Sequence, residues 1–160
     1  MLLQWYLPAE RAPPYVIYGP PGTGKTMTIV EAVLQLYTGK KRANILICAA
    51  SNTAADHVLE KLLQASYLIR PSDIFKLNAQ SRQYEDVSTD FIKFCFFQDR
   101  VFMCPPLQAL VRYTIVISTY SSSYQLHAEG IHQGHCTHIF LDEGGQASRT
   151  EAMVPFVKVV

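Results

Sequence analysis

One octapeptide near the amino terminus has the residue types and the spacing to hold a polyphosphate. Residues Gly19-Pro-Pro-Gly-Thr-Gly-Lys-Thr26 match the pattern G-x-x-x-x-G-K-[ST]. Glycines let successive backbone N–H groups turn inward around phosphate oxygens, the lysine adds a positive charge, and the threonine hydroxyl is a magnesium ligand. The pattern therefore predicts that a nucleoside triphosphate binds at Gly19, Pro20, Pro21, Gly22, Thr23, Gly24, Lys25 and Thr26.

A pair of acids offers the chemistry that a bound triphosphate needs for hydrolysis. The apolar run Ile139-Phe-Leu ends in Asp142 and Glu143. In such a pair the first acid holds magnesium, directly or through water, and the second positions and deprotonates the attacking water. Adjacent acids at a strand end could instead cap the next helix. Together with the phosphate loop, however, they predict magnesium at Thr26 and Asp142, with Glu143 as the general base.

Four short apolar segments are predicted to form the strands that position these groups. They are typical of buried parallel strands and cover residues 15–18, 44–49, 114–118 and 138–141. Helices are predicted at 25–37 and about 53–66, the second capped by Ser51, Asn52 or Thr53. From about 70 to 112 the pattern is irregular, aromatic and interrupted by prolines. It indicates an insertion with one helical piece near 90–97.

Polar segments follow the carboxyl ends of the predicted strands, at 19–26, 51–56, 118–123 and 142–146. In an open parallel sheet this edge is where ligands bind. The hydroxyl and amide groups of Ser51-Asn52-Thr53 and Ser118-Thr119-Tyr120-Ser121 suit phosphate or sugar oxygens. Helix capping or turn formation is the alternative for each segment taken singly. Their shared edge favours a polar ligand track beside the nucleotide.

The composition is that of a soluble globular domain. Of 160 residues, 49% are hydrophobic and 17% charged. No apolar run approaches the length of a membrane span and no signal peptide pattern is present, so no membrane partner is predicted. A net charge of +1 neither indicates nor excludes a nucleic-acid partner. Four widely spaced cysteines predict reduced, mostly buried thiols in the cytosol or nucleus.

Taken together, these segments resemble the first RecA-like domain of superfamily 1 RNA helicases of the Upf-like group, closest to its Mov-like and plant silencing-defective branch. The resemblance is carried by residues 15–26, by Ile47-Cys-Ala-Ala-Ser-Asn-Thr-Ala-Ala-Asp56 and by Asp142-Glu-Gly-Gly-Gln146. Phe75-Lys-Leu-Asn78 and Val116-Ile-Ser-Thr-Tyr120 fall where the family has further RNA-contacting segments. The implied fold is an α/β P-loop NTPase (RecA-like) fold, an open parallel sheet with flanking helices and an inserted, partly helical segment.

The resemblance also implies an activity: ATP hydrolysis coupled to movement along RNA and to RNA unwinding. ATP and magnesium are the implied cofactors, and single-stranded RNA, held by its backbone, is the implied partner. Lys25 and Glu143 would act in hydrolysis, and Gln146 would sense the γ-phosphate. The implied RNA contacts are Ser51, Asn52, Ser118 and Thr119. The branch is associated with RNA silencing, which implies a cytoplasmic location in RNP granules and silencing or granule proteins as partners.

The sequence departs from the family pattern in several places. Ala50 stands where the family has proline before Ser-Asn, and Gly144 replaces alanine after the acidic pair, which frees the backbone there. We expect an incomplete domain, with a lead-in at 1–12, a partial RecA-like domain at 13–160 and the insertion at about 70–112. A second RecA-like domain with its arginine finger is expected to lie outside this sequence. The chain alone should therefore bind nucleotide weakly and hydrolyse it poorly.

Two alternatives stay open at this point. AAA+ ATPases share the phosphate loop, but they place their Asp-Glu pair much nearer to it than the 117 positions between Lys25 and Asp142. They also have no need of Ser51-Asn52. A catalytically incomplete helicase-like protein would bind RNA or protein partners without turnover.

Overall fold

A sheet with strand order β2-β1-β8-β3-β7-β4 organises the chain in the computed structural model, which describes residues 2–5, 15–20, 22–39, 43–65, 67–145 and 147–159. The strands are β1 (Leu2–Trp5), β2 (Tyr15–Val16), β3 (Ile45–Ala49), β4 (Ile74–Lys76), β7 (Ile115–Thr119) and β8 (His138–Leu141). The last four named run parallel, with Ile47 of β3 opposite Phe140 on one side and Ile117 on the other. β1 runs antiparallel to both β2 and β8. The predicted α/β fold with a parallel sheet is confirmed.

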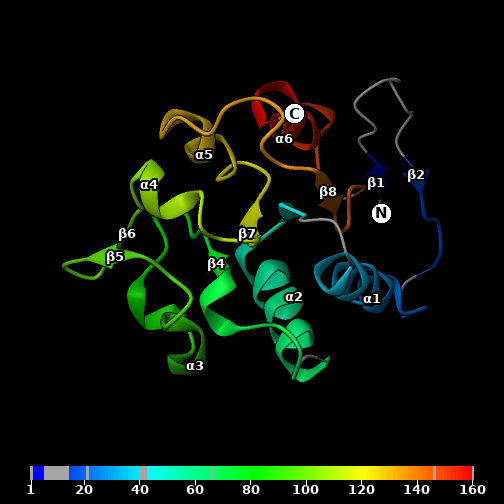
Figure 1. The fold of residues 1–160 in the computed structure, drawn as a ribbon, viewed down its shortest axis with the longest axis horizontal. Helices are drawn as coiled ribbons and strands as arrows, with labels where there is room; N and C mark the ends of the chain where they lie inside the picture. Colours follow the sequence, from blue (N-terminus) through cyan, green and yellow to red (C-terminus); the bar gives the residue numbers. More distant parts are fainter. Residues whose placement is uncertain are drawn as a thin grey trace.

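Helices cover both faces of the sheet (Figure 1). On one face, α1 (Lys25–Thr38) and α2 (Asn52–Ala65) pack over Ile47 and its neighbours. On the other face, α4 (Leu107–Leu110), α5 (Tyr124–Ala128) and α6 (Arg149–Val159) pack over Leu46 and Cys48. Successive side chains of β3 point to opposite faces, so one strand serves both cores. Among the described helices, none combines the length and the apolar character needed to cross a bilayer.

The helix α2 forms because its apolar residues lie on one face and its first turn is capped. Its buried residues follow the spacing i, i+3, i+4, i+7, at Ala55, Val58, Leu59 and Leu62. Ser51 Oγ accepts a hydrogen bond of 3.1 Å from the backbone N–H of Ala54. Both long predicted helices are confirmed to within about one residue of their predicted ends, and Ser51 is the cap among the three candidates.

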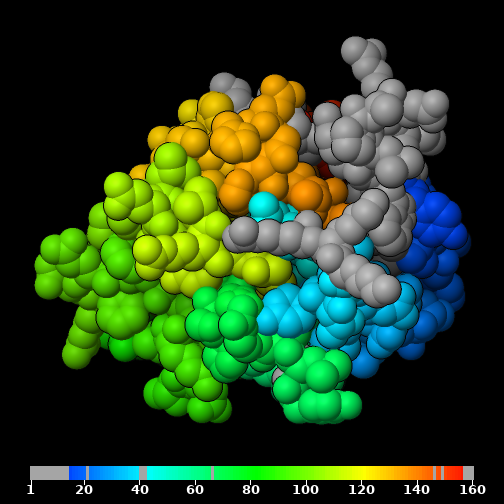
Figure 2. Space-filling model, viewed as in Figure 1, coloured from blue at the N-terminus to red at the C-terminus, as the bar shows by residue number. Residues whose placement is uncertain are grey.

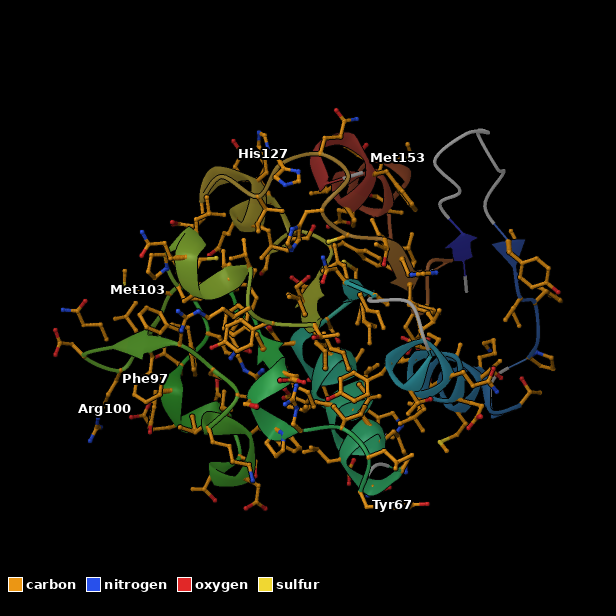
Figure 3. The ribbon with its side chains drawn as sticks, viewed as in Figure 1. Tyr67, Phe97, Arg100, Met103, His127 and Met153 are labelled. Carbon is orange, nitrogen blue, oxygen red and sulfur yellow. The ribbon has the colours of Figure 1, made fainter. Side chains whose placement is uncertain are left out.

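The segment predicted as an insertion contributes a strand to the sheet. It contains β4, the short helix α3 (Thr89–Ile92), the hairpin β5 (Phe97–Gln98) and β6 (Val101–Phe102), and then α4. Figure 2 shows this segment, in green, gathered at one side of the molecule. Phe97, Arg100 and Met103 lie on and beside the hairpin (Figure 3). The helical piece expected at 90–97 is wrong beyond Ile92, because Phe97 begins an antiparallel pair.

The strand before the phosphate loop differs most from its prediction. β2 covers only Tyr15 and Val16, and both side chains are 60% exposed. A buried parallel strand at 15–18 is therefore wrong, because β1 lies between β2 and β8 and leaves β2 at the edge of the sheet. Part of the predicted lead-in, Leu2–Trp5, thus belongs to the sheet, whereas residues 6–12 lie outside the described part of the chain.

Candidate functional site

The phosphate loop turns into α1 through two left-handed glycines. Gly22 has φ 78° and Gly24 has φ 82°, and Gly24 is the residue immediately before α1. Residues with side chains rarely adopt this conformation, so both positions call for glycine. The turn presents the free N–H groups of the first helical turn to a ligand, as in known anion sites. Pro21 lies outside the described residues.

Lys25 lies across this loop and contacts its backbone. Its Nζ donates hydrogen bonds of 2.8 Å to the carbonyl oxygens of both Gly19 and Pro20. Thr23 Oγ1 donates to the same Pro20 carbonyl, also at 2.8 Å. The ammonium group is therefore held where the outer phosphates of a nucleotide bind in loops of this kind.

Thr26 and Asp142 meet, as the sequence predicts for a magnesium site. Thr26 Oγ1 donates a hydrogen bond of 3.1 Å to Asp142 Oδ2, although 116 positions separate the two residues. Asp142 is buried, and among the described residues its Oδ1 has no hydrogen-bond partner. A buried carboxylate oxygen without a partner is costly and calls for an explanation. A hydroxyl and a carboxylate with a free oxygen fit magnesium, which prefers oxygen ligands.

Glu143 follows directly and adopts an unusual backbone conformation. Its φ is 55°, in the left-handed region, which costs about 1–2 kcal/mol for a residue with a side chain. Such strain persists only where the surroundings impose it. The side chain is exposed, so its carboxylate can reach water beside Asp142. Gln146, the predicted γ-phosphate sensor, lies outside the described residues.

Tyr120 ties this acidic pair to the neighbouring strands. Its hydroxyl donates a hydrogen bond of 2.6 Å to the backbone carbonyl of Asp142, and its backbone N–H donates to the carbonyl of Ala49 at 3.1 Å. The ring is buried, and burial raises the pKa of the phenol well above its ordinary value, so the hydroxyl stays a donor. Sequence reasoning assigned Tyr120 no role of its own. The sequence feature that could have indicated a role is a single aromatic residue among the serines and threonines at the end of β7 and just after it.

The four predicted RNA contacts fall into two groups. Ser51 is exposed at the start of α2, and the Oδ1 of its neighbour Asn52 is buried with no partner among the described residues. Ser118 is fully buried with its hydroxyl 3.5 Å from Cys48 Sγ, and Thr119 Oγ1 donates to Ser122 Oγ at 2.9 Å. The structure therefore leaves Ser51 and Asn52 at the ligand edge, whereas the hydroxyls of the other two point inward. That of Ser118 contacts β3, and that of Thr119 binds the loop after β7.

A buried ion cluster supports the start of α2. Lys76 of β4 is fully buried, and its Nζ lies 2.8 Å from Asp56 Oδ1 in α2. Arg82 contacts the other carboxylate oxygen of Asp56 through Nη2. Asn78 Oδ1 accepts hydrogen bonds from Lys76 at 3.0 Å and from Arg82 at 2.9 Å. We call these four residues, Asp56, Lys76, Asn78 and Arg82, the ion cluster.

Burial and pairing act in opposite directions on the pKa values of the ion cluster. Burial alone raises the pKa of Asp56, but hydrogen bonds from Arg82 and Lys76 outweigh it, so this pKa lies below its ordinary value. Burial lowers the pKa of Lys76 despite the nearby Asp56. Every residue of Phe75-Lys-Leu-Asn78 is buried, so this segment supports the ligand edge from within and has no exposed side chain for RNA. The missed signal was a lysine inside an apolar run.

Comparison with known proteins identifies the family. A family model described as AAA domain matches residues 5–95. The chain is 41% identical over 143 residues to RNA helicase Mov10l1 from Homo sapiens, covering 89% of this chain and 11% of that protein. It is 39% identical over 147 residues to putative helicase MOV-10 from Gallus gallus, covering 91% and 15%. It is 32% identical over 161 residues to probable RNA helicase armi from Drosophila melanogaster, covering 90% and 14%.

The chain thus spans between 11% and 15% of the length of these relatives. No solved structure matches it significantly. The family model covers more than half of the chain, including the phosphate loop and the ion cluster. The chain therefore belongs to the AAA domain family, as a member similar to the Mov-like helicases.

Proposed function

We propose that this chain is the ATP-binding part of an ATP-dependent RNA helicase, in which ATP hydrolysis drives RNA unwinding. The observation that carries the proposal is the hydrogen bond of 3.1 Å between Thr26 and Asp142. It joins the phosphate loop and the acidic pair into one site, as magnesium-dependent hydrolysis requires. Relatives named as RNA helicases, similar over nine-tenths of the chain, support the choice of RNA as the substrate that is moved.

Each side chain of the site has a distinct task in this proposal. Magnesium, when bound, would supply positive charge against the charge that develops on the phosphate oxygens. Thr26 and Asp142 would hold it, because Asp142 Oδ1 has no other partner among the described residues. Lys25 would turn from the carbonyls of Gly19 and Pro20 to an outer phosphate oxygen. This exchange replaces two neutral acceptors with an anionic one, and charge-assisted hydrogen bonds are roughly twice as strong as neutral ones.

Glu143 is the proposed general base. It follows the magnesium ligand directly, and its exposed carboxylate can accept the proton of the attacking water. Removal of such a base lowers the rate by about 10²–10⁴. Its left-handed φ supports the proposal, because strained residues cluster at active sites.

RNA is proposed to lie along the edge formed by the carboxyl ends of β3 and β7. Ser51 accepts a hydrogen bond from Ala54, and its own hydroxyl proton remains available for a phosphate oxygen. Asn52 Oδ1 is buried without a partner among the described residues, and a side chain turned outward would offer this acceptor to a donor such as a ribose hydroxyl. We propose that Thr119 contributes through the loop after β7, which its hydroxyl holds, and that Ser118 contributes through its contact between β7 and β3.

An AAA+ ATPase that does not act on RNA is the alternative that the broad family description leaves open. The family model ends at residue 95, before the acidic pair. The helicase relatives match 89% to 91% of the chain and so extend past that point. This wider similarity favours the helicase.

We also propose a cytoplasmic role in RNA silencing, with RNP-granule proteins as partners. Its support is the likeness to the Mov-like branch. A tagged chain should co-localise with granule markers, and a Lys25→Ala variant should lose or change that pattern if nucleotide binding governs it. A wholly nuclear distribution would rule this role out.

Binding and turnover measurements on this chain test the proposed activity. A fluorescent ATP analogue should bind in a magnesium-dependent manner, and single-stranded RNA should raise ATP turnover. Lys25→Ala should lose binding, whereas Glu143→Gln should keep binding and lose turnover. A rate of ATP turnover that stays the same when RNA is added would favour the AAA+ alternative. Binding of nucleotide and RNA without ATP turnover would favour a catalytically incomplete protein. Failure of the wild-type chain to bind nucleotide would overturn the proposal.

A further inference from the structure

The peptide unit between Asp142 and Glu143 is held from outside by one side chain. The carbonyl of Asp142 and the N–H of Glu143 lie in the same rigid plane, so the orientation of that carbonyl limits φ of Glu143. Tyr120 donates its hydroxyl proton to this carbonyl at 2.6 Å, in a buried position. Flipping the peptide to relieve the left-handed φ of 55° would break this bond and leave a buried phenol without a partner.

Tyr120 is itself fixed to the loop that follows β7. Ser123 Oγ donates a hydrogen bond of 2.6 Å to the carbonyl of Tyr120. Thr119 and Ser122 are joined by a further hydrogen bond of 2.9 Å, and all of these side chains are buried. A displacement of residues 119–123 would therefore move the ring of Tyr120, and with it the hydrogen bond to the carbonyl of Asp142.

We infer that Tyr120 is a positioning residue that holds Glu143 in its left-handed conformation and links it to the loop at residues 119–123. The inference rests on the proposed function, because it gives Glu143 the role of general base. The link offers a physical route by which RNA at the carboxyl edge of β7 could change the position of the base. The positioning group is a phenol hydroxyl that lies outside both the phosphate loop and the acidic pair.

A folding cycle tests the conformational part without any activity. Glycine relieves left-handed strain, so Glu143→Gly should raise the urea midpoint of unfolding in the otherwise wild-type chain. In a Tyr120→Phe background, where the peptide is free to flip, the rise should fall by about half or more. Tyr37→Phe is the matched control, because Tyr37 also donates a hydrogen bond of 2.6 Å, to Asp73 at the other end of the sheet. In that background the rise should be unchanged. An equal rise in all three backgrounds overturns the inference.

Turnover measurements test the functional part. Tyr120→Phe should lower kcat for ATP by about ten- to a hundredfold and leave KM nearly unchanged, because phosphate binding does not involve the phenol. The factor by which single-stranded RNA raises turnover should fall towards one. Tyr37→Phe should change neither quantity, although it loses a similar hydrogen bond. If Tyr120→Phe turns over ATP at the wild-type rate, the inference is overturned. Absence of turnover in the wild type overturns the proposed function instead, and the folding cycle still decides on Tyr120.

Discussion

Replacing Asp56 with asparagine tests the ion cluster most directly, because this single carboxylate faces two cations. Lys76 is fully buried and its Nζ lies 2.8 Å from Asp56, while the side chain of Arg82 is 8% exposed. Asparagine keeps the shape of the side chain but removes its charge. Within the described part of the chain, both cations would then keep neutral acceptors such as Asn78 Oδ1.

The expected loss is large for one substitution. Breaking a buried ion pair by removing one partner costs about 3–5 kcal/mol, because a charge is left buried without compensation. Domains of this kind have a total free energy of unfolding of about 5–15 kcal/mol. At roughly 2–4 °C per kcal/mol for a chain of this length, Tm should fall by about 6–20 °C.

Urea unfolding at pH 7, followed by far-ultraviolet circular dichroism, measures the loss. The matched control is Glu85→Gln, because Glu85 pairs with Arg100 at 3.1 Å and both side chains are more than 60% exposed. That variant should lose less than about 1 kcal/mol. Adding Lys76→Met to Asp56→Asn removes one unpaired charge and should restore part of the stability.

Two results would refute the reasoning. One is a loss for Asp56→Asn no greater than that for Glu85→Gln, which would mean that the buried carboxylate is not needed to compensate the cations. The other is a further loss when Lys76→Met is added, which would mean that the lysine stabilises the fold without its partner.

Three further predictions follow from the described contacts. Thr26→Val should abolish the magnesium-dependent tightening of ATP-analogue binding, whereas Thr28→Val, which loses only a bond of 3.3 Å to Gly24, should retain it; an equal magnesium response would contradict the site. The stability from Asp56 is present above the ordinary aspartate pKa of about 4 and is lost as pH falls through its lower folded pKa. As pH falls below about 4, Tm of the wild type should therefore fall more steeply than Tm of Asp56→Asn; parallel curves would contradict this. A disulfide reagent at pH 8 should label the folded chain slowly, whereas in urea it should label all four thiols. The reason is that burial raises the pKa values of Cys48, Cys104 and Cys136 to about 12; fast labelling of these three thiols in the folded chain would contradict their burial.

The parallel strands of the core, the phosphate loop and the acidic pair were predictable because each has a recognisable local sequence pattern. The runs that became β3, β7 and β8 are apolar and bounded by polar turns, and such runs indicate buried strands wherever they occur. The meeting of Thr26 with Asp142 followed from the rule that ligands gather at the carboxyl ends of parallel strands.

The misjudged elements depend on partners far away in the sequence. β4 is three residues long and contains Lys76, and a charged residue is tolerated in a core only when it is paired. The pairing residue, Asp56, lies on another element. The exposure of β2 depends on β1 lying next to it. Tyr120 could not be assigned because it binds a backbone carbonyl, which every residue has.

The position of Lys25 bears on which anions the loop accepts. Its ammonium group already has two carbonyl acceptors at 2.8 Å, from Gly19 and Pro20. An incoming anion competes with these internal ligands, and a singly charged ion gains little by displacing both. A polyphosphate offers several anionic oxygens at once, so its charge-assisted hydrogen bonds can outweigh the two carbonyl bonds that Lys25 gives up. We therefore expect the loop to favour a polyphosphate over a singly charged anion, because the ligand must replace both backbone carbonyls at Lys25.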